Sequence, residues 1–462
     1  MTTPRFDADL IRRYDCFGPR YTSYPTAVQF RSDFDAEAYR NAALENARKS
    51  ATNPLSLYVH VPFCASPCFY CACNRIITRS SDRARAYLAR LYEEIKLQAA
   101  LFGRTRSIEQ LHFGGGTPTF LPMNHLADLM TQLARHFSLN DSPGREYSIE
   151  IDPRTVAPES VRVLADLGFN RMSLGVQDFD PSVQLAVNRV QSAADTLRVV
   201  DAARSACFNS ISFDLIYGLP RQTPSSFERT LQTVLEARPD RLAVYAYAHM
   251  PHVFKAQRRL KSEELPSANA RLDLLALTIG TLTDAGYVYI GMDHFALPGD
   301  ELVRAKEQRT LHRNFQGYST HADCDLVGLG VSAIGRVGDS YVQNFKQLPE
   351  YYAAIDAGRL AVHRGITLTH DDCVRRAVIQ EIMCHERVDF ASIDRRFGIH
   401  FVDYFAAELQ RLRPFESDGL IELHPNEICV TDVGRLLMRN VAMAFDAYVD
   451  LKASVPIYSK AI

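Results

Sequence analysis

The chain has 462 residues, of which 47% are hydrophobic and 23% charged, and its formal net charge is -2. This length is enough for a barrel-sized catalytic domain of roughly 250 residues with smaller additions. The small net charge gives no electrostatic reason to expect nucleic acid or an anionic membrane as a partner. No apolar run approaches the ~20 residues of a membrane span. The N-terminal sequence MTTPRFDADLIRRYD lacks the apolar core of a secretory signal. We therefore expect a cytoplasmic protein with no membrane span.

Residues 1–38 have weak periodicity and contain the segment GPRYTSYPT, from Gly18 to Thr26, which is rich in turn formers and aromatic side chains. Such a segment has little apolar patterning with which to form a core of its own. The sequence predicts an arm that lies over another part of the molecule, at the active site.

From Leu55 onward, apolar β-rich runs alternate with amphipathic stretches at helical spacing. The predicted strands are Leu55–Phe63, Ile108–Phe113, Tyr147–Ile151, Arg171–Val176, Ser210–Ile216 and Arg241–Tyr247, with Tyr287–Met292 as a further one. The predicted helices between them are Arg83–Phe102, His125–Phe137, Pro158–Leu167, Ala193–Ala206, Ser225–Ala237 and Ala268–Ala285.

Six consecutive βα units predict an α/β fold in which parallel strands, joined by right-handed crossovers, close wholly or partly into a barrel. We assign this barrel to residues 39–300, followed by a barrel extension and cavity-lining segment at 301–365. Chemistry in such barrels collects in the loops after the C-terminal ends of the strands.

After about Gly365 the pattern becomes mainly helical, and residues 366–462 are expected to form a separate domain. Its predicted elements are the helices Asp371–Met383, Phe401–Leu412 and Asp432–Tyr448, and a hairpin of Leu420–Leu423 with Ile428–Val430. Helices around a small hairpin suggest a winged-helix-like domain. Because the charge is not basic, a packing or lid role is favoured over DNA binding.

Four of the ten cysteines lie within ten residues, directly after the first predicted strand. Cys64, Cys68 and Cys71 have the spacing C-x3-C-x2-C, which lets three thiolates hold three irons of a cubane cluster and leave the fourth iron open. Electron-transfer ferredoxins instead close all four positions with cysteine. The alternative is a four-cysteine zinc site that includes Cys73, but zinc ligands usually come in two separated pairs. The pattern favours a catalytic iron–sulfur cluster and leaves the role of Cys73 open.

The cysteine loop after an apolar strand resembles the signature of the radical S-adenosylmethionine (SAM) superfamily. Further blocks resemble a branch of that superfamily that acts on porphyrinogens in haem biosynthesis. These blocks are GPRYTSYPTA (Gly18–Ala27), LYVHVPFC (Leu57–Cys64), CACN (Cys71–Asn74), GGGTPTFL (Gly114–Leu121), IEIDPR (Ile149–Arg154), NRMSLGVQDF (Asn170–Phe179), FDLIYGLP (Phe213–Pro220), IGMDHFA (Ile290–Ala296) and HRNFQGY (His312–Tyr318). The resemblance implies a partial (βα)6 TIM-like radical SAM barrel with an N-terminal arm and a mainly helical C-terminal domain.

The resemblance also implies the cofactors and their residues. One [4Fe-4S] cluster would be held by Cys64, Cys68 and Cys71, with two molecules of SAM beside it. The implied SAM-binding residues are Tyr58, Tyr70, Gly115, Gly116, Thr117, Glu150, Gln177, Arg189, Asp214, Ala248 and Ile334. Candidates for the substrate cavity are Arg20, Arg313, Phe315 and Gln316, the two arginines because substrate carboxylates need cationic partners.

The reaction implied is the anaerobic oxidative decarboxylation of two propionate side chains of coproporphyrinogen III to vinyl groups, through 5′-deoxyadenosyl radicals from SAM. The product is protoporphyrinogen IX. The expected partner is an electron donor protein such as flavodoxin or ferredoxin, and the chain is expected to be a monomer.

Two other members of the superfamily are alternatives: a haem-binding chaperone and an anaerobic haem-degrading methyltransferase. The chaperones typically carry Phe where this chain has Cys73 and lack the GPRYTSYPT arm, while the methyltransferase fits the C-terminal blocks less well. These features favour the decarboxylating enzyme.

Overall fold

The computed structural model describes residues 3–50, 52–449 and 460. Its largest element is a 13-stranded sheet in which the six predicted barrel strands are neighbours and run parallel. These strands are β1 (Leu55–Val61), β4 (Ser107–Gly115), β6 (Glu146–Ile151), β7 (Arg171–Gln177), β8 (Ser210–Tyr217) and β9 (Arg241–Ala246). The helices that follow them are α3 (Ser81–Phe102), α4 (Met123–His136), α5 (Pro158–Asp166), α6 (Pro181–Ala186), α7 (Ala193–Ser205), α8 (Pro224–Ala237) and α9 (Ala268–Asp284). The predicted partial (βα)6 barrel is confirmed.

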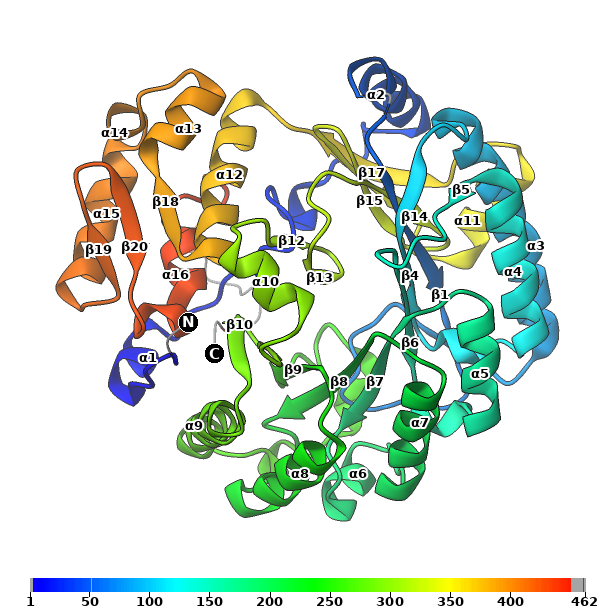
Figure 1. The fold of residues 1–462 in the computed structure, drawn as a ribbon, viewed down its shortest axis with the longest axis horizontal. Helices are drawn as coiled ribbons and strands as arrows, with labels where there is room; N and C mark the ends of the chain where they lie inside the picture. Colours follow the sequence, from blue (N-terminus) through cyan, green and yellow to red (C-terminus); the bar gives the residue numbers. More distant parts are fainter. Residues whose placement is uncertain (1–2, 51, 450–459, 461–462) are drawn as a thin grey trace.

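The sheet is curved and stays open, with β10 (Val288–Gly291) at one end and β17 (Val362–Thr367) at the other. Figure 1 shows α3, α4, α5, α7 and α8 along the outer, convex side of this curve. The C-terminal helices, in orange and red, lie opposite them across the open side. The concave side of the sheet therefore faces parts of the chain that are distant from it in sequence. None of the helices in the described part of the chain is long and apolar enough to cross a membrane.

Apolar and polar side chains alternate along the parallel strands. This alternation gives the sheet an apolar face against the helices and a polar face on the concave side. On β8, Ile211, Phe213 and Leu215 are buried in the hydrophobic core, while Ser212 and Asp214 line a cavity on the concave side. The same period of two recurs on β6 and β7. Because the convex side is covered by apolar helix faces, the polar positions point into the barrel, which gives a polar interior.

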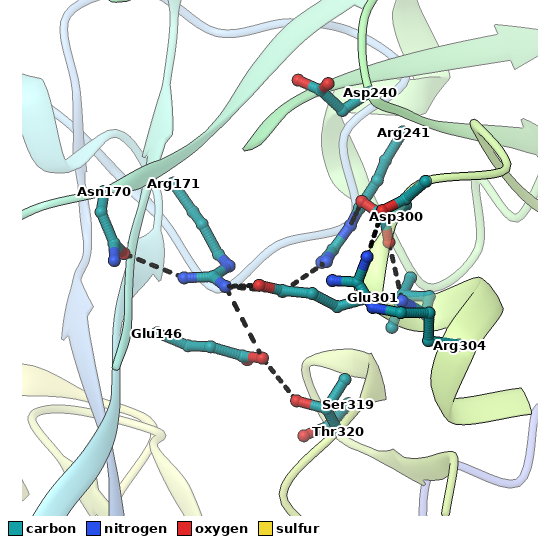
Figure 2. Close-up of polar contacts among 12 residues, drawn as sticks. Glu146, Asn170, Arg171, Asp240, Arg241, Asp300, Glu301, Arg304, Ser319 and Thr320 are labelled. Atoms are coloured by element: carbon teal, nitrogen blue, oxygen red, sulfur yellow. Dashed lines mark hydrogen bonds and ion pairs between the residues drawn. The ribbon is translucent and has the colours of Figure 1, made fainter. Parts of the chain in front are cut away.

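Charged residues close the end of the barrel at which the strands begin (Figure 2). Arg171, the first residue of β7, donates from Nη2 to both carboxylate oxygens of Glu301 at 2.6 and 2.5 Å. Arg241, the first residue of β9, donates to Asp300 at 2.8 Å and to Glu301 at 3.2 Å. Asp300 caps α10 (Glu301–Glu307) and Glu301 is its first residue, so these pairs fasten that helix across the N-terminal end of the barrel. Charges at this end serve packing, which leaves the opposite end for chemistry.

The sheet continues beyond β1 in a way that the periodicity did not predict. Strand β14 (Asp325–Leu329) pairs with β1 in parallel, and β15 (Ile334–Val337), β16 (Ser340–Asn344) and β17 follow in antiparallel order. At the other edge, the strand predicted at Tyr287–Met292 exists as β10. It is antiparallel to β11 (His294–Ala296), which is antiparallel to β9, so it does not add a parallel strand to the barrel.

The C-terminal region is mainly helical, as predicted, around a three-stranded sheet. Its helices are α12 (His370–His385), α13 (Phe390–Phe397), α14 (Phe401–Tyr404), α15 (Ala406–Ser417) and α16 (Met438–Met443). Its strands, in the order β18–β20–β19, are β18 (Arg387–Asp389), β19 (Ile421–Leu423) and β20 (Glu427–Val430).

Two predictions for this region were wrong in detail. The helix predicted at Phe401–Leu412 is broken into α14 and α15. The last predicted helix begins as a 3-10 turn at Gly434–Leu437 and ends at Met443, because the chain then turns so that Ala447 and Asp446 bond to the arm.

The N-terminal segment is an arm that also contains helices not predicted from the sequence. Helix α1 (Ala8–Tyr14) is capped by Asp7, and α2 (Ala36–Lys49) by Asp35. Between these helices, Tyr21 and Tyr24 are almost fully buried in the core of the C-terminal region. Tyr21 donates to Asp446 at 2.9 Å, and the Tyr24 hydroxyl accepts from the Ala447 N–H at 3.0 Å. The arm is thus packed against the C-terminal region.

Candidate active site

The cysteine loop follows β1 at the C-terminal end of the barrel and is fixed by main-chain contacts. Strand β2 (Phe63–Cys64) pairs with β3 (Ile76–Ile77), which closes the loop into a ring. Arg75 donates to the carbonyls of Cys71 at 2.9 Å and Cys68 at 3.1 Å. The loop is therefore shaped before any cofactor binds, by contacts that leave the sulfur atoms available.

A cavity of about 380 Å³ opens between this loop and the ends of β4, β6, β7 and β8. Its lining includes most of the residues predicted to bind the cluster and SAM. They are Cys64, Cys68, Tyr70, Cys71, Gly115, Gly116, Thr117, Glu150, Gln177, Arg189 and Asp214. Eleven positions spread over 151 residues of sequence are brought together because parallel strands all end at the same rim.

Glycine is required where β4 passes under the cysteine loop. A Cβ atom on Gly116 would lie 2.7 to 2.8 Å from backbone atoms of Pro62 and Phe63. Gly115 has a φ of +116°, and a Cβ there would lie 2.7 Å from the ring of His60. The Gly116 N–H donates to the carbonyl of Val61 at 2.8 Å. The glycines thus let the loop and β4 approach closely enough to form one wall of the cavity.

Two carboxyl groups, on β6 and β8, face the cavity from either side of β7 and have different pKa values. Burial alone would raise the pKa of Glu150, but hydrogen bonds from His112 at 3.0 Å and from the Gly115 N–H at 3.1 Å outweigh it and lower that pKa. Burial raises the pKa of Asp214 to about 7, although Ser173 donates to it at 2.9 Å. Glu150 is therefore an anion, and Asp214 can take up or release a proton near neutral pH.

Arg189 is 7% exposed and lies against the cysteine loop. Its Nη1 is 3.5 Å from the Cys68 sulfur and 3.1 Å from Asp152, and its Nη2 donates to the Gly175 carbonyl at 2.5 Å. Arg154 approaches the same sulfur at 3.8 Å and pairs with Asp152 at 2.7 Å. Two guanidinium groups therefore lie next to the Cys68 sulfur atom.

Asp152 and Arg154 also line this cavity but were not predicted as site residues. Both belong to the IEIDPR block and directly follow β6, so their place after a strand end was the signal that could have identified them.

A second cavity, of about 470 Å³, lies on the concave side of the sheet and shares Cys73, Gly115 and Glu150 with the first. The other predicted residues, with one exception, line it: Tyr58, Ile334, Arg20, Arg313, Phe315 and Gln316. Residues not singled out for the site, among them His112, Tyr245 and His294, also line this cavity. Ala248 lies elsewhere, in the wall of a third cavity of about 350 Å³.

The thiols fit a cluster better than a single metal ion. Ligand atoms around one zinc ion lie close together, because each Zn–S bond is ≈ 2.3 Å long. Among the described residues, the group whose ligand atoms all lie within 4.8 Å of one another is His424, Glu427 and Cys429, which are far in sequence from the loop. No three of the described loop thiols form such a compact group. A site for one zinc ion is therefore not preformed in the loop.

Comparison with known proteins agrees with this geometry. A model of the radical SAM superfamily matches residues 58–234, and a model of the HemN C-terminal domain matches residues 368–437. An oxygen-independent coproporphyrinogen III oxidase from Pseudomonas aeruginosa is 53% identical, with 97% of each chain covered. The enzyme of the same name from Escherichia coli is 48% identical over 99% of this chain and 98% of that protein.

The solved structure of the Escherichia coli coproporphyrinogen III oxidase, described as a radical SAM enzyme, superimposes with a TM-score of 0.92. It has 46% sequence identity and covers 97% of this chain and 100% of that one. Similarity of this extent covers the arm, the barrel and the C-terminal region together. This chain therefore belongs to the radical SAM family of oxygen-independent coproporphyrinogen III oxidases.

Proposed function

We propose that the cavity beside the cysteine loop is where this oxidase carries its cofactors, with Cys64, Cys68 and Cys71 as the cluster ligands. The observation that carries the proposal is the shared lining of one cavity by these cysteines, the Gly115–Thr117 segment and the polar ends of β6, β7 and β8. When bound, the cluster and SAM supply a radical able to remove a hydrogen atom from a propionate side chain of coproporphyrinogen III.

The chain's own residues orient the cofactor and exclude water. The carboxylate of Glu150 is placed to accept from an ammonium or hydroxyl group, and the backbone of Gly115 and Gly116 allows close approach. Arg189 and Asp214 flank the same space. Gln177 ends β7 with a φ of +66°, a strained conformation that is typical of functional positions and turns its side chain at the cavity wall.

A second SAM molecule would bind in the 470 Å³ cavity, next to Tyr58, Phe315, Gln316 and Ile334. Support comes from the volume of this cavity and from the wall that it shares with the first, at Gly115 and Glu150. The Tyr58 ring stacks on His112 at 5.8 Å and its hydroxyl lies 3.0 Å from His60, so this wall is rigid. The substrate would lie next to this SAM molecule, where the cavity meets the third cavity at Arg20.

The electron donor would be a small protein such as flavodoxin or ferredoxin, docking at the cysteine loop. Ala65 and the segment from Ala72 to Asn74 are exposed there, so a donor can come close to the cluster. The chain would act as a monomer, because parts of this one chain supply the described walls of all three cavities. Its location in the cytoplasm stays a prediction. The division into residues 1–38, 39–300, 301–365 and 366–462 stays a prediction.

The test is an anaerobic assay with coproporphyrinogen III, SAM and a reductant, in which products are separated by chromatography. We expect protoporphyrinogen IX as the product. The amount of 5′-deoxyadenosine is compared with the number of vinyl groups formed. Steady cleavage of SAM without vinyl product, in the presence of an electron acceptor, would contradict the proposal. Stable haem binding by the purified protein would instead favour the chaperone alternative.

A further inference from the structure

The 470 Å³ cavity contains a buried cation for which the described residues offer no acidic partner. Arg313, on β12 (His312–Asn314), is 3% exposed and forms no ion pair with any carboxylate in the described part of the chain. Its Nε donates to the Arg20 carbonyl at 3.3 Å, and its guanidinium lies 4.8 Å from the centre of the Tyr318 ring. Its Nη1 has no hydrogen-bond partner. A buried charge without a counterion is costly, so this geometry indicates an anionic ligand.

Two more nitrogen atoms in the same wall are buried without a partner, Nε2 of Gln316 and Nδ1 of His294. Burial and the nearby charges of Arg313 and Arg20 hold the pKa of His294 well below its usual range, so the ring is neutral. Three unsatisfied polar groups in one wall are more than packing explains, because buried polar groups are normally hydrogen-bonded.

Two further arginines lie beside Arg313 and complete a group that we call the arginine cluster: Arg20, Arg313 and Arg439. Burial lowers the pKa of Arg20, and the charge of Arg313 adds to the effect. Burial lowers the pKa of Arg439 to about 9, with further contributions from Arg20 and Arg313. Arg20 pairs with Asp293, and Arg439 donates to the Pro19 carbonyl at 3.0 Å. The three guanidinium groups thus repel one another, and an anion would relieve that repulsion.

The cluster lies on the side of the 470 Å³ cavity away from the cysteine loop. Arg20 lines both that cavity and the third cavity, of about 350 Å³. Among described residues, the charged lining of the third cavity is Arg20, Arg271, Arg439, Lys460 and one acid, Asp293. None of the cluster arginines lines the cavity that contains Cys64, Cys68 and Cys71. A carboxylate held by the cluster therefore lies outside the cavity that contains the three cysteines.

We propose that the arginine cluster binds the two propionates of the porphyrinogen that are not decarboxylated. This rests on the function above: the substrate has four propionates, two become vinyl groups at the cofactor side, and two remain in the product. With the ring beside the arginine cluster, where the 470 Å³ cavity meets the third cavity at Arg20, the reacting side chain points to the cysteine loop and the retained carboxylates point to Arg20 and Arg313. Ion pairs to retained groups are not lost when CO2 leaves, so the cluster holds substrate and product alike.

The experiment uses the reconstituted holoenzyme and two fluorescent probes, protoporphyrin IX and its dimethyl ester, which differ only in the charge of the two retained propionates. We expect the wild type to bind the diacid at least about tenfold more tightly than the ester, as fluorescence titration measures. Arg313→Gln and Arg20→Gln should each weaken diacid binding about tenfold and leave ester binding unchanged. Arg313→Lys should recover part of the preference.

The matched control is Arg221→Gln, which removes an arginine paired with Glu264 at the surface and should change neither affinity. Normal iron content of each variant shows that it folds. The inference is overturned if the wild type binds the diacid and the ester with equal affinity. It is also overturned if the variants lose affinity for both probes to the same extent. If the wild type forms vinyl product but binds both probes equally, this inference is wrong and the proposed function stands. If the wild type forms no vinyl product, the proposed function is wrong.

Discussion

Single positions at the ends of strands decide what faces the cofactor cavity. Glu150, Gln177 and Asp214 each occupy a polar position in a strand whose neighbouring residues are buried in the core. A shift of one residue in any of these strands would turn the polar side chain toward the helices. The register of the parallel pairs, fixed by the apolar positions, therefore also fixes the site.

The cluster should need three of the four loop cysteines. Cys64→Ala, Cys68→Ala and Cys71→Ala should each lose the iron–sulfur absorbance and SAM cleavage, because a cubane with one open iron uses three thiolates. Cys73→Ser should keep the absorbance, since Cys73 is exposed and outside the motif. Iron analysis under anaerobic conditions checks this. Loss of iron in Cys73→Ser to the same degree would show that the ligand assignment is wrong.

Gly116 should tolerate no side chain. In Gly116→Ala the new Cβ would meet backbone atoms of Pro62 and Phe63 at 2.7 to 2.8 Å, and backbone cannot move aside as a flexible side chain can. The cysteine loop should be displaced, and most of the bound iron lost. The control is Gly144→Ala, where a Cβ meets nothing within 4 Å and iron content should be normal. Full iron content in Gly116→Ala would contradict this account of the loop.

At the scale of elements, helix α3 is tied to the sheet extension by one buried carboxyl group. Glu94 accepts from the Gly330 N–H at 2.6 Å and from the Tyr351 hydroxyl at 2.7 Å on one oxygen, and from Asn344 at 2.6 Å on the other. These partners follow β14, lie in α11 (Leu348–Asp356) and end β16. The helix and the strands beyond β1 are joined through this residue.

This carboxyl group should make stability depend on pH. Burial raises the pKa of Glu94 to about 7, so between its unfolded value near 4.5 and about 7 the folded protein binds a proton that the unfolded chain does not. Its contribution to stability is therefore present below pH 4.5 and is lost as the pH rises to 7. Relative to Glu94→Gln, the wild type should lose about 3 kcal/mol over this range.

Chemical unfolding of both proteins at a series of pH values measures this difference. The readout is how the difference in free energy of unfolding changes with pH. The amide of the variant also changes the hydrogen bonds, but that adds an amount that does not depend on pH. Exposed Glu45, whose pKa is lowered by Lys49, supplies the control: Glu45→Gln should not reproduce the trend. A difference that stays constant from pH 4.5 to 7 would show that Glu94 is charged throughout.

At the scale of the whole molecule, the arm joins the barrel mouth to the C-terminal region. Arg20 pairs with Asp293, just after β10, while Tyr21 and Tyr24 are buried in the C-terminal core. Arg20 and Thr22 of the arm line the cavity for substrate, and the C-terminal core holds the arm in place. If the arm detaches and the cavity opens to solvent, SAM cleavage should be less tightly coupled to substrate oxidation.

Weakening the contacts of the arm should uncouple SAM cleavage from substrate oxidation. The double variant Tyr21→Phe with Tyr24→Phe removes hydrogen bonds to Asp446 and from Ala447, each contributing about 1 kcal/mol. We expect faster tryptic cleavage after Arg20 or Arg31, and fewer vinyl groups per 5′-deoxyadenosine, at normal iron content. Tyr404→Phe, which loses a bond to Asp371 within the C-terminal region, is the control. An unchanged product ratio despite faster cleavage would separate the arm from catalysis.

The sequence by itself determined the features that depend on local pattern. Periodicity predicted the six βα units, because each strand and helix must present an apolar face to the same core. The spacing of Cys64, Cys68 and Cys71 indicated the cluster, because ligands on one short loop are neighbours in any fold. Here the structure matched the predicted elements to within a few residues.

Only the tertiary structure decided the contacts between distant segments. The pairing of β14 with β1, the break between α14 and α15 and the short last helix depend on packing partners that no local pattern specifies. The arginine cluster is the clearest case. Arg20 and Arg313 were candidates from the sequence, but nothing in it indicated Arg439, and the three come from regions more than 100 residues apart. Burial side by side, with one acid among them, makes them an anion site, and burial is a property of the folded chain.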